Sequence, residues 1–406
     1  MKRMKSILAF TTALCMCAGY LPTVAQVVPE AIFISAIAED VEDTEEFATS
    51  GTCGENSTWE RDEETGILTI SGTGAMTGWG SQDSPWIYDC EVIIEDGITT
   101  IGKDVFYASP KSITIRNPNC EIYDSEDTVP DTTTIYGYSN STAQTYAEKY
   151  NKKFKEIVTS GTCGENLTWE FDQETGTLTI NGTGEMTDYN DYDNRSTWWG
   201  WRTSIEKVVI GEGITTIGDF AFEYCFNLTS VTIPDSMTII GDHTFSLCKS
   251  LTSITIPAGV TTISAWAFLN CYALTSIYVS EDNPNYSSQD GVLFNKDKTT
   301  LVTFPQNNST NYIIPDSVTI IGDFAFFACS ALESITIPDS VTTIGVCAFT
   351  STSLTSVTIP DSVTTIGGSA FSTTGLISIT IPDSVTTIVG NTFNGCSSLK
   401  SVTIPD

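Results

Sequence analysis

The sequence predicts a mainly β protein built as a solenoid, in which short coils of chain stack along one axis. Three observations support this fold class. From Leu228 on, equivalent Leu and Phe residues return every 22 or 23 residues, a strand-like segment ending in proline opens each unit, and a longer block is duplicated before the array. A period of roughly 20–29 residues with recurring Leu and Ile is typical of leucine-rich-repeat solenoids, because only stacked coils bury a continuous apolar face.

The chain opens with features of a secretory leader. Lys2, Arg3 and Lys5 precede an apolar run, which predicts a signal peptide over 1–38, with cleavage after Ala25 as the alternative. An acidic linker follows over 39–48. No later apolar stretch approaches the ~18 residues that a membrane span needs, so no transmembrane segment is expected in the mature chain. We therefore expect a secreted or cell-surface protein exported in the bacterial manner.

The duplicated block predicts two cap modules. "TSGTCGENSTWERDEETGILTISGTGAMT" starts at Thr49, and a near copy starts at Thr159. Each copy has two strand-like runs around a Thr-Gly turn, which is typical of a β-hairpin. We assign β-hairpin cap modules to 49–91 and 159–207, where they would cover the open first edge of a solenoid.

Between the two caps the sequence predicts a short array of its own. Residues 92–119 read as a single repeat coil, and 120–158 read as a C-terminal-type closure. The closure contains a helix-forming stretch, "STAQTYAEKYNKKF", with Ser141 as a plausible N-cap.

The main array is assigned to 208–406. Each coil is expected to hold a short strand with alternating inward Val or Ile, a proline, a turn, a second short strand and one helical turn bearing Phe and Cys. An insertion at 279–312 interrupts it, either as a self-packed hairpin with a turn at 296–298 or as part of a binding face. The array is predicted to lack a C-terminal cap, which suggests a truncated chain or edge-to-edge self-association at the last strand.

The repeat unit resembles a known family. "IPDSVTTIGxxAFxxCxxLxSVTIP" is similar to the BspA-like leucine-rich-repeat surface proteins, strongly over 208–406 and as one coil over 92–115. The resemblance implies a solenoid, an extracellular or cell-surface location, and adhesion or ligand binding without catalysis. It names no ligand.

Charge and residue inventory exclude several function classes. Fifty acidic against eighteen basic residues give a formal charge of −32, which argues against a nucleic-acid partner. The single histidine, His243, lacks the partners of a catalytic triad and is predicted to be an exposed residue without a role. No Cys-x-x-Cys pair remains after the leader, and no calcium loop is present, so no metal or cofactor is expected. We predict that the protein is not an enzyme.

The cysteines of the array share one repeat position. A column of this kind has no preferred pairing, so free buried thiols are favoured over disulfides, which the coil spacing would also allow. The column consists of Cys225, Cys248, Cys271, Cys329 and Cys396.

Candidate binding residues lie in two places. The stretch 188–202 is rich in aromatic side chains, which either pack in the cap or bind a carbohydrate or protein partner. Its candidates are Tyr189, Tyr192, Trp198, Trp199 and Trp201, with Trp198 and Trp199 expected at the surface. The outward strand face carries a Ser/Thr ladder that could be a plain polar exterior or match an ordered lattice, and Tyr278 interrupts it.

Two classes of function remain open. The leading hypothesis is an adhesion or ligand-binding module for an extracellular protein or glycan. The alternative is a structural scaffold of the cell envelope without a specific soluble ligand.

Overall fold

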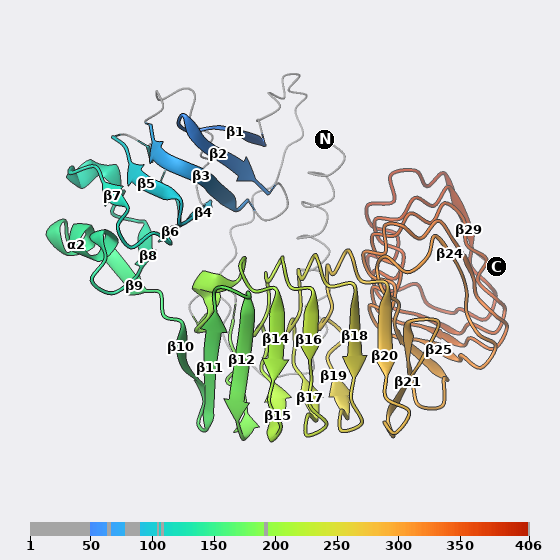
Figure 1. Ribbon diagram of the computed structural model, residues 1–406. Helices are drawn as coiled ribbons and strands as arrows, with labels where there is room; N and C mark the ends of the chain where they lie inside the picture. The colour runs from blue at the N-terminus through green and yellow to red at the C-terminus, as the bar shows by residue number, and fades with distance from the viewer. Residues whose placement is uncertain are drawn as a thin grey trace. The chain divides into compact units, whose positions relative to one another are not determined.

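The computed structural model describes residues 49–62, 66–77, 90–103, 105–106, 109–190 and 194–404. The predicted leader and linker lie outside these residues. The chain divides between Val158 and Thr159 into two compact units, which are coloured blue to green and green to red in Figure 1. Strands dominate both units, and they form a solenoid as the repeat pattern predicts.

The first unit starts with the predicted hairpin, whose last strand feeds two ladders. Its first strands are β1 (Ser50–Thr52), β2 (Asn56–Arg61), β3 (Leu68–Met76), β4 (Glu91–Ile94) and β5 (Ile98–Ile101). β1, β2 and β3 pair antiparallel, whereas β3 pairs in parallel with β4 through its first half and with β5 through its second half. The hairpin therefore occupies the edge of both ladders, so no coil edge is left open there.

The ladders of the first unit continue beyond one coil. The later elements are β6 (Ser112–Ile115), β7 (Glu121–Ile122), η2 (Glu126–Thr128), β8 (Thr134–Gly137), α2 (Thr142–Lys149) and β9 (Lys153–Glu156). β4, β6, β8 and β9 pair in parallel in that order, and β5 pairs with β7. The segment expected to close the array thus adds further strands to the same ladder. Ser141 caps α2 as predicted, since its hydroxyl accepts from the Gln144 N–H at 3.1 Å.

The second unit repeats this arrangement at its start. Its cap holds β10 (Ser160–Gly164), β11 (Leu167–Asp172), β12 (Thr177–Gly182), β13 (Gly184–Glu185) and η3 (Trp199–Trp201). β12 pairs in parallel with β14 (Lys207–Ile210), and β13 with β15 (Ile214–Ile217). The two copies of the duplicated sequence therefore form the same structure, a hairpin that supplies the first strand of two parallel ladders.

Two ladders of short strands run along the second unit, and Figure 1 shows the first of them side by side from β14 to β20. The first ladder holds β14, β16 (Ser230–Thr232), β18 (Ser253–Ile256), β20 (Ser276–Val279), β24 (Asn311–Ile313), β26 (Ser334–Thr336), β29 (Ser378–Thr380) and β30 (Ser401–Thr403). The second holds β15, β17 (Ile239–Ile240), β19 (Thr262–Ile263), β25 (Ile320–Ile321), β27 (Thr343–Ile344) and β28 (Thr365–Ile366).

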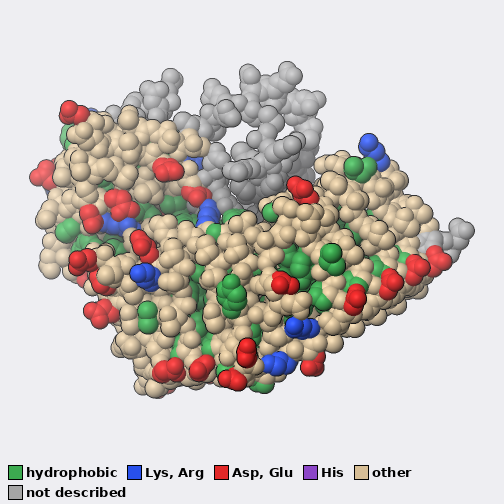
Figure 2. Space-filling view, turned by 45° about the vertical axis from the view of Figure 1, so that its right-hand side comes forward, with side chains coloured by type: hydrophobic (Ala, Val, Ile, Leu, Met, Phe, Trp, Pro, Cys, Tyr) green, Lys and Arg blue, Asp and Glu red, His purple; other side chains and the backbone are tan. Residues whose placement is uncertain are grey.

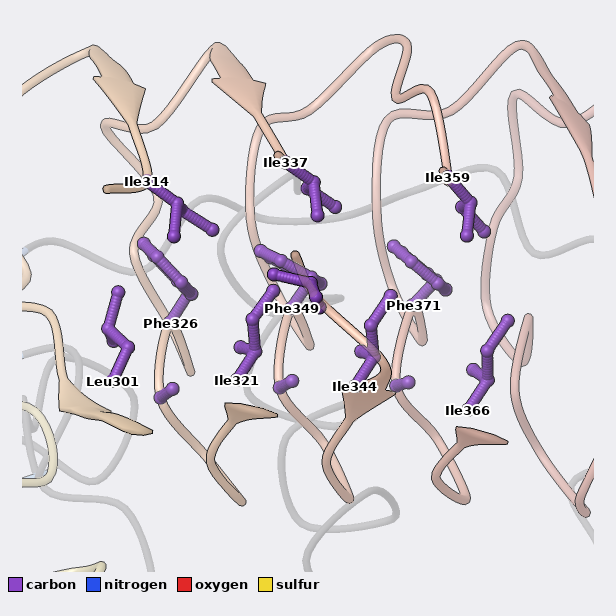
Figure 3. Packing of buried hydrophobic residues seen from close by; sticks show 14 of the residues in the cluster. Leu301, Ile314, Ile321, Phe326, Ile337, Ile344, Phe349, Ile359, Ile366 and Phe371 are labelled. Atoms are coloured by element: carbon purple, nitrogen blue, oxygen red, sulfur yellow. The ribbon is translucent and has the colours of Figure 1, made fainter. Parts of the chain in front are cut away.

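The core of the second unit is a set of columns, one residue per coil (Figure 3). Inward Ile residues of the two ladders flank a central column of Phe rings, which stack 5.0–6.0 Å apart in neighbouring coils. The fully buried members of this Phe column are Phe222, Phe245, Phe326, Phe349 and Phe371. Each coil alone would expose its ring, so the stack shares burial between neighbours.

The segment around each Phe is not the expected helical turn. It is a run of turns in which residues two before and two after the Phe adopt left-handed backbone, such as Phe220 (φ 55) and Tyr224 (φ 62). Around Phe268 only the later residue, Asn270 (φ 59), does so. Alternate N–H groups then donate to the next coil, as Phe222 does to the Thr244 carbonyl at 2.9 Å. This third backbone ladder replaces the internal hydrogen bonds of a helix, because every buried N–H needs an acceptor.

The insertion forms the predicted hairpin. β21 (Tyr286–Gln289), β22 (Val292–Asn295) and β23 (Thr300–Thr303) pair antiparallel, and the turn at 296–298 joins the last two. β23 then pairs with β25, and Phe304 stacks on Phe326 at 4.9 Å, so the array resumes with its core intact. Within the described strands, β20 pairs only with β18 and β24 only with β26, so the first ladder is interrupted here.

Candidate ligand-binding surface

The Trp-rich stretch is part of the core, not of the surface. Trp198, Trp199, Trp201 and Tyr189 are all buried, and Trp198 is completely so. The expectation that Trp198 and Trp199 lie at the surface is therefore wrong. Tyr192 lies outside the described residues.

Packing explains each of these rings. Trp198 stacks on Phe222 and donates its indole N–H to the Ala221 carbonyl at 2.9 Å. Trp201 packs on Phe171 of β11, with ring centroids 4.9 Å apart. The side chains of Arg195 and Arg202 lie over Trp199, 4.1 and 4.4 Å from the ring centroid. The segment thus packs between the hairpin and the first coil. Its aromatic rings already contact protein side chains.

The cysteine column is also structural. Cys225, Cys248, Cys271, Cys329 and Cys396 are free thiols, as predicted. Cys248 donates to the Phe222 carbonyl of the preceding coil at 3.3 Å, and Cys271 donates to the Phe245 carbonyl at 3.1 Å. Burial raises the pKa of Cys225 and of Cys271 to about 12, so these thiols stay protonated and able to donate.

The two shortened coils show why Cys can be absent. Thr352 and Thr374 donate their hydroxyls to the carbonyls of Phe349 and Phe371, at 2.9 and 3.0 Å. The Cys is therefore a buried hydrogen-bond donor as well as a small apolar side chain. A Thr in the shorter loop also places a buried donor here, but it bonds the Phe carbonyl of its own coil, whereas the Cys bonds that of the preceding coil.

His243 is buried, with 7% of its surface exposed, so the expectation of an exposed residue is wrong. Its ring stacks on Phe220 at 4.7 Å and meets Trp266 edge-on at 4.7 Å. Its Nδ1 lies 3.2 Å from Asp242 Oδ2 but lacks the alignment of a hydrogen bond. Among the described residues, no group of three or more His, Cys, Asp or Glu is arranged to hold a metal ion. His243 is a packing residue.

Three apolar side chains take a Thr position on the outward strand face: Val209, which is opposite Thr232 and 37% exposed, and the more exposed Tyr278 and Ile313. Most coils expose Thr at the third residue of the repeat phrase S-x-T-I: Thr232, Thr255, Thr336, Thr358, Thr380 and Thr403. Tyr278 and Ile313 take this position in the coils on either side of the insertion, and they are 52% and 74% exposed. Their register is fixed by pairing, since Tyr278 lies opposite Thr255 and Ile313 opposite Thr336.

The insertion holds this part of the face in place. The Ile277 N–H donates to the Gly291 carbonyl at 2.8 Å, and the Val279 N–H to the Ser288 hydroxyl at 3.1 Å. Asn308 bridges the carbonyls of Thr275 and Asp290 through its amide nitrogen, at 2.9 Å each. The edge of β20 is thereby satisfied locally, and Tyr278 projects from a braced strand.

Ile313 was missed by the sequence analysis, although a signal exists. Aligning "NYIIPDSV" with the repeat phrase "SVTIPDSV" puts Ile313 in the outward Thr position. The insertion hides the alignment, because the usual spacing is lost there.

Acidic side chains form a separate row in the array. Figure 2 shows them along one edge of the surface. The position after the repeat proline is an exposed Asp in the later coils, namely Asp316, Asp339, Asp361 and Asp383. Spread over one edge, these charges favour solubility over any single ligand.

In the portion of the chain that the structure describes, no helix has the length and apolarity required to cross a membrane. Family comparison matches the BspA type leucine rich repeat region in six copies, over residues 199–310 and 301–406. These ranges span half of the chain. No curated protein matches the chain.

Solved structures of bacterial repeat proteins are similar to the chain. A leucine-rich repeat protein from Eubacterium ventriosum is 28% identical, with 61% of this chain and 86% of that chain covered and a TM-score of 0.42. A leucine rich cell surface protein from Faecalibacterium prausnitzii is 21% identical, with 90% and 96% covered and a TM-score of 0.41. The pneumococcal vaccine antigen PcpA is 19% identical, with 86% of each chain covered and a TM-score of 0.46.

Proposed function

The chain belongs to the BspA-type leucine-rich-repeat family, and on that basis we propose that it is a secreted or cell-surface protein that binds an extracellular protein or glycan without catalysing a reaction. The leader-like N-terminus and the charge of −32 support an exported, self-repelling protein.

One observation carries the assignment of a binding face. Tyr278 and Ile313 expose apolar surface at positions where neighbouring coils place Thr, on strands flanking the insertion at 279–312. Neither side chain is needed for the coil, because Thr satisfies the same strand position elsewhere. Exposed Tyr and aliphatic side chains beside a polar rim are typical of interaction sites.

The rest of the face suits such a role. The surrounding Ser and Thr hydroxyls can donate and accept hydrogen bonds, and they are fixed by the parallel ladder. A rigid scaffold reduces the entropy lost on binding, since few side chains must be ordered. Tyr278 would therefore act as an anchor and the hydroxyl ladder as a polar rim.

The test replaces both apolar residues with Thr, the residue that most coils have at this position. Tyr278→Thr combined with Ile313→Thr keeps the strand chemistry of the neighbouring coils. The full chain and this double variant would be compared in pull-down and array binding to bacterial polysaccharides, extracellular matrix proteins and whole cells. Ile239→Thr is the matched control, because Ile239 is also an exposed Ile on a ladder strand, and Thr262 holds its place in the next coil.

We expect the double variant to lose at least about tenfold in apparent affinity, as removal of interface anchors commonly does. The Ile239→Thr control should bind like the parent. Undiminished binding by the double variant would place the ligand elsewhere. A parent protein that binds none of these materials would favour the structural scaffold instead.

A further inference from the structure

A second aromatic row lies outside the core, at the corner that follows the second strand. Its members are Phe220, His243, Trp266 and Phe324, each two residues before a buried Phe of the central column. Neighbouring ring centroids are 4.7, 4.7 and 5.2 Å apart. The last contact joins residues 58 positions apart, because the insertion folds away and lets the row continue.

The fold does not require rings at this corner. Phe220 and Phe324 adopt left-handed backbone with φ of 55° and 58°, which L-residues other than Asn and Asp rarely do, whereas Trp266 does not have a positive φ. Ser369 and Asn391 hold the same corner in later coils with φ of 57° and 65°. The corner therefore accepts Ser or Asn as well as an aromatic side chain, so the coil does not need a ring there.

The row presents apolar surface to solvent. Phe220, Trp266 and Phe324 are half-buried, so part of each ring remains accessible. Trp266 is nearly perpendicular to both neighbours, at 86° to His243 and 83° to Phe324. Leu269 also lies partly buried, in a small apolar cluster with Phe324 outside the main core.

Carboxylates border the row on one side. Asp219, Asp242 and Asp323 directly precede Phe220, His243 and Phe324 in the chain. One oxygen of Asp219 and one of Asp323 accept an N–H from the next coil, at 2.6 and 2.7 Å.

Among the described residues, the basic group beside these carboxylates is His243, whose Nδ1 lies 3.2 Å from Asp242 Oδ2. Across the residues that the structure describes, no Lys or Arg forms an ion pair with Asp219, Asp242 or Asp323. The corner therefore combines partly exposed aromatic rings with carboxylates that form no ion pair with Lys or Arg among the described residues.

We propose that this aromatic row and its carboxylates bind a cationic partner, a Lys- and Arg-rich segment of another protein. Cations are attracted to the faces of Trp and Phe rings, and carboxylates accept hydrogen bonds from guanidinium and ammonium groups. The charge of −32 adds long-range steering toward such a segment. This surface is separate from the strand face around Tyr278, so each can be tested without the other.

The test separates the row from the general acidity of the chain. Binding of a fluorescein-labelled nona-arginine peptide to the full chain would be followed by anisotropy at physiological salt. Trp266→Ser with Phe324→Ser removes the row without changing net charge, and Ser is tolerated at this corner in the coil of Ser369. We expect binding to weaken by about tenfold, which corresponds to the loss of two partly desolvated cation–π contacts.

A matched pair of charge variants gives the second readout. Asp323→Asn borders the row, whereas Asp361→Asn changes the same charge in the exposed acidic row at another corner. We expect Asp323→Asn to weaken binding about threefold more than Asp361→Asn, because a contact charge exceeds a screened distant one. Equal effects of the two, or a ring variant that binds like the parent, would overturn the proposal.

Two further controls complete the test. Tyr278→Thr with Ile313→Thr should leave peptide binding unchanged, which separates this proposal from the strand-face function. Displacement of the peptide by a neutral oligosaccharide would show that the row recognises sugars, and the cationic assignment would then be wrong. Circular dichroism melting of every variant checks that the coils remain folded.

Discussion

Trp198 of the second cap stacks on Phe222 of the first coil, with ring centroids 5.5 Å apart and planes 19° from parallel. Phe222 in turn stacks on Phe245 at 5.5 Å. The cap thus contributes the first ring of the central column as well as the first strand of each ladder. Cap and array share one core, so a substitution at Trp198 should also lower the stability of the coils that follow the cap.

Trp198→Ala should therefore destabilise the second unit strongly. Removal of a completely buried Trp leaves a cavity and an unpartnered Phe222, which costs roughly 3–5 kcal/mol. Urea unfolding followed by circular dichroism measures the change. Trp198→Phe is the control, since it keeps a stacking ring and loses only the indole hydrogen bond to Ala221. Equal costs for the two variants would contradict a role for ring stacking.

The cysteine column should resist alkylation in the folded protein even in mild base. With a pKa near 12, only about a thousandth of Cys225 or Cys271 is thiolate at pH 9, and both side chains are buried. Iodoacetamide labelling with peptide mass spectrometry should modify the half-buried Cys396 first. All cysteines of the column should react with iodoacetamide once urea has unfolded the protein. Native labelling of Cys225 as fast as Cys396 would refute the buried column.

Asp219→Asn should stabilise the protein at neutral pH. Burial, together with the nearby charges of Asp188 and Asp242, raises the pKa of Asp219 in the folded state. A raised carboxyl pKa favours folding below the unfolded pKa of ~3.9, and this contribution is lost as pH rises through the folded pKa. The Asn variant keeps an acceptor for the Asp242 N–H without the charge.

The gain at pH 7 should stay below about 1 kcal/mol, because Asp219 is only partly buried and water screens its charge. Thermal melts at pH 7 and at about pH 4 provide the measurement, and the advantage of the variant should shrink in acid. Asp316→Asn, at an exposed site, should show no such trend. A stability advantage of Asp219→Asn that grows in acid would contradict a raised pKa of Asp219.

Thr373→Gly should stabilise the array. Thr373 is β-branched yet has a φ of 55°, whereas Gly395 holds the equivalent corner of the next coil with a φ of 72°. Relief of left-handed strain, less the entropy cost of Gly, predicts a gain of about 0.5–1 kcal/mol in urea unfolding. Thr336→Gly on β26 should instead destabilise by a similar amount. A loss of stability at Thr373 would show that its backbone is unstrained.

Repeat period and alternation predicted much of the fold. Inward positions such as Ile344 and outward ones such as Thr336 follow from a two-residue strand period, which is local and needs no knowledge of the partner coil. Ser141 was recognised as an N-cap for the same reason, since capping depends on neighbours three residues away.

The site was predicted less well, because exposure outside regular strands is not a local property. Tyr278 lies on a regular strand and is exposed, while Trp198 and Trp199 lie in an irregular segment and are buried. His243 was misjudged in the same way, because its corner has no periodicity that separates inside from outside.

The sequence by itself determined the coil length, the inward columns and the duplicated hairpin, since each repeats at a fixed spacing and every coil meets an equivalent neighbour. It favoured free thiols in the cysteine column but left disulfides open, and the structure has the thiols free. Tertiary structure alone decided which aromatic rings close the core and which remain outside it. Trp198 is buried because Phe222 lies against it, and Trp266 meets Phe324 because the insertion folds away. Contacts of this kind depend on which segments pack together after the chain folds, so short-range sequence patterns do not predict them.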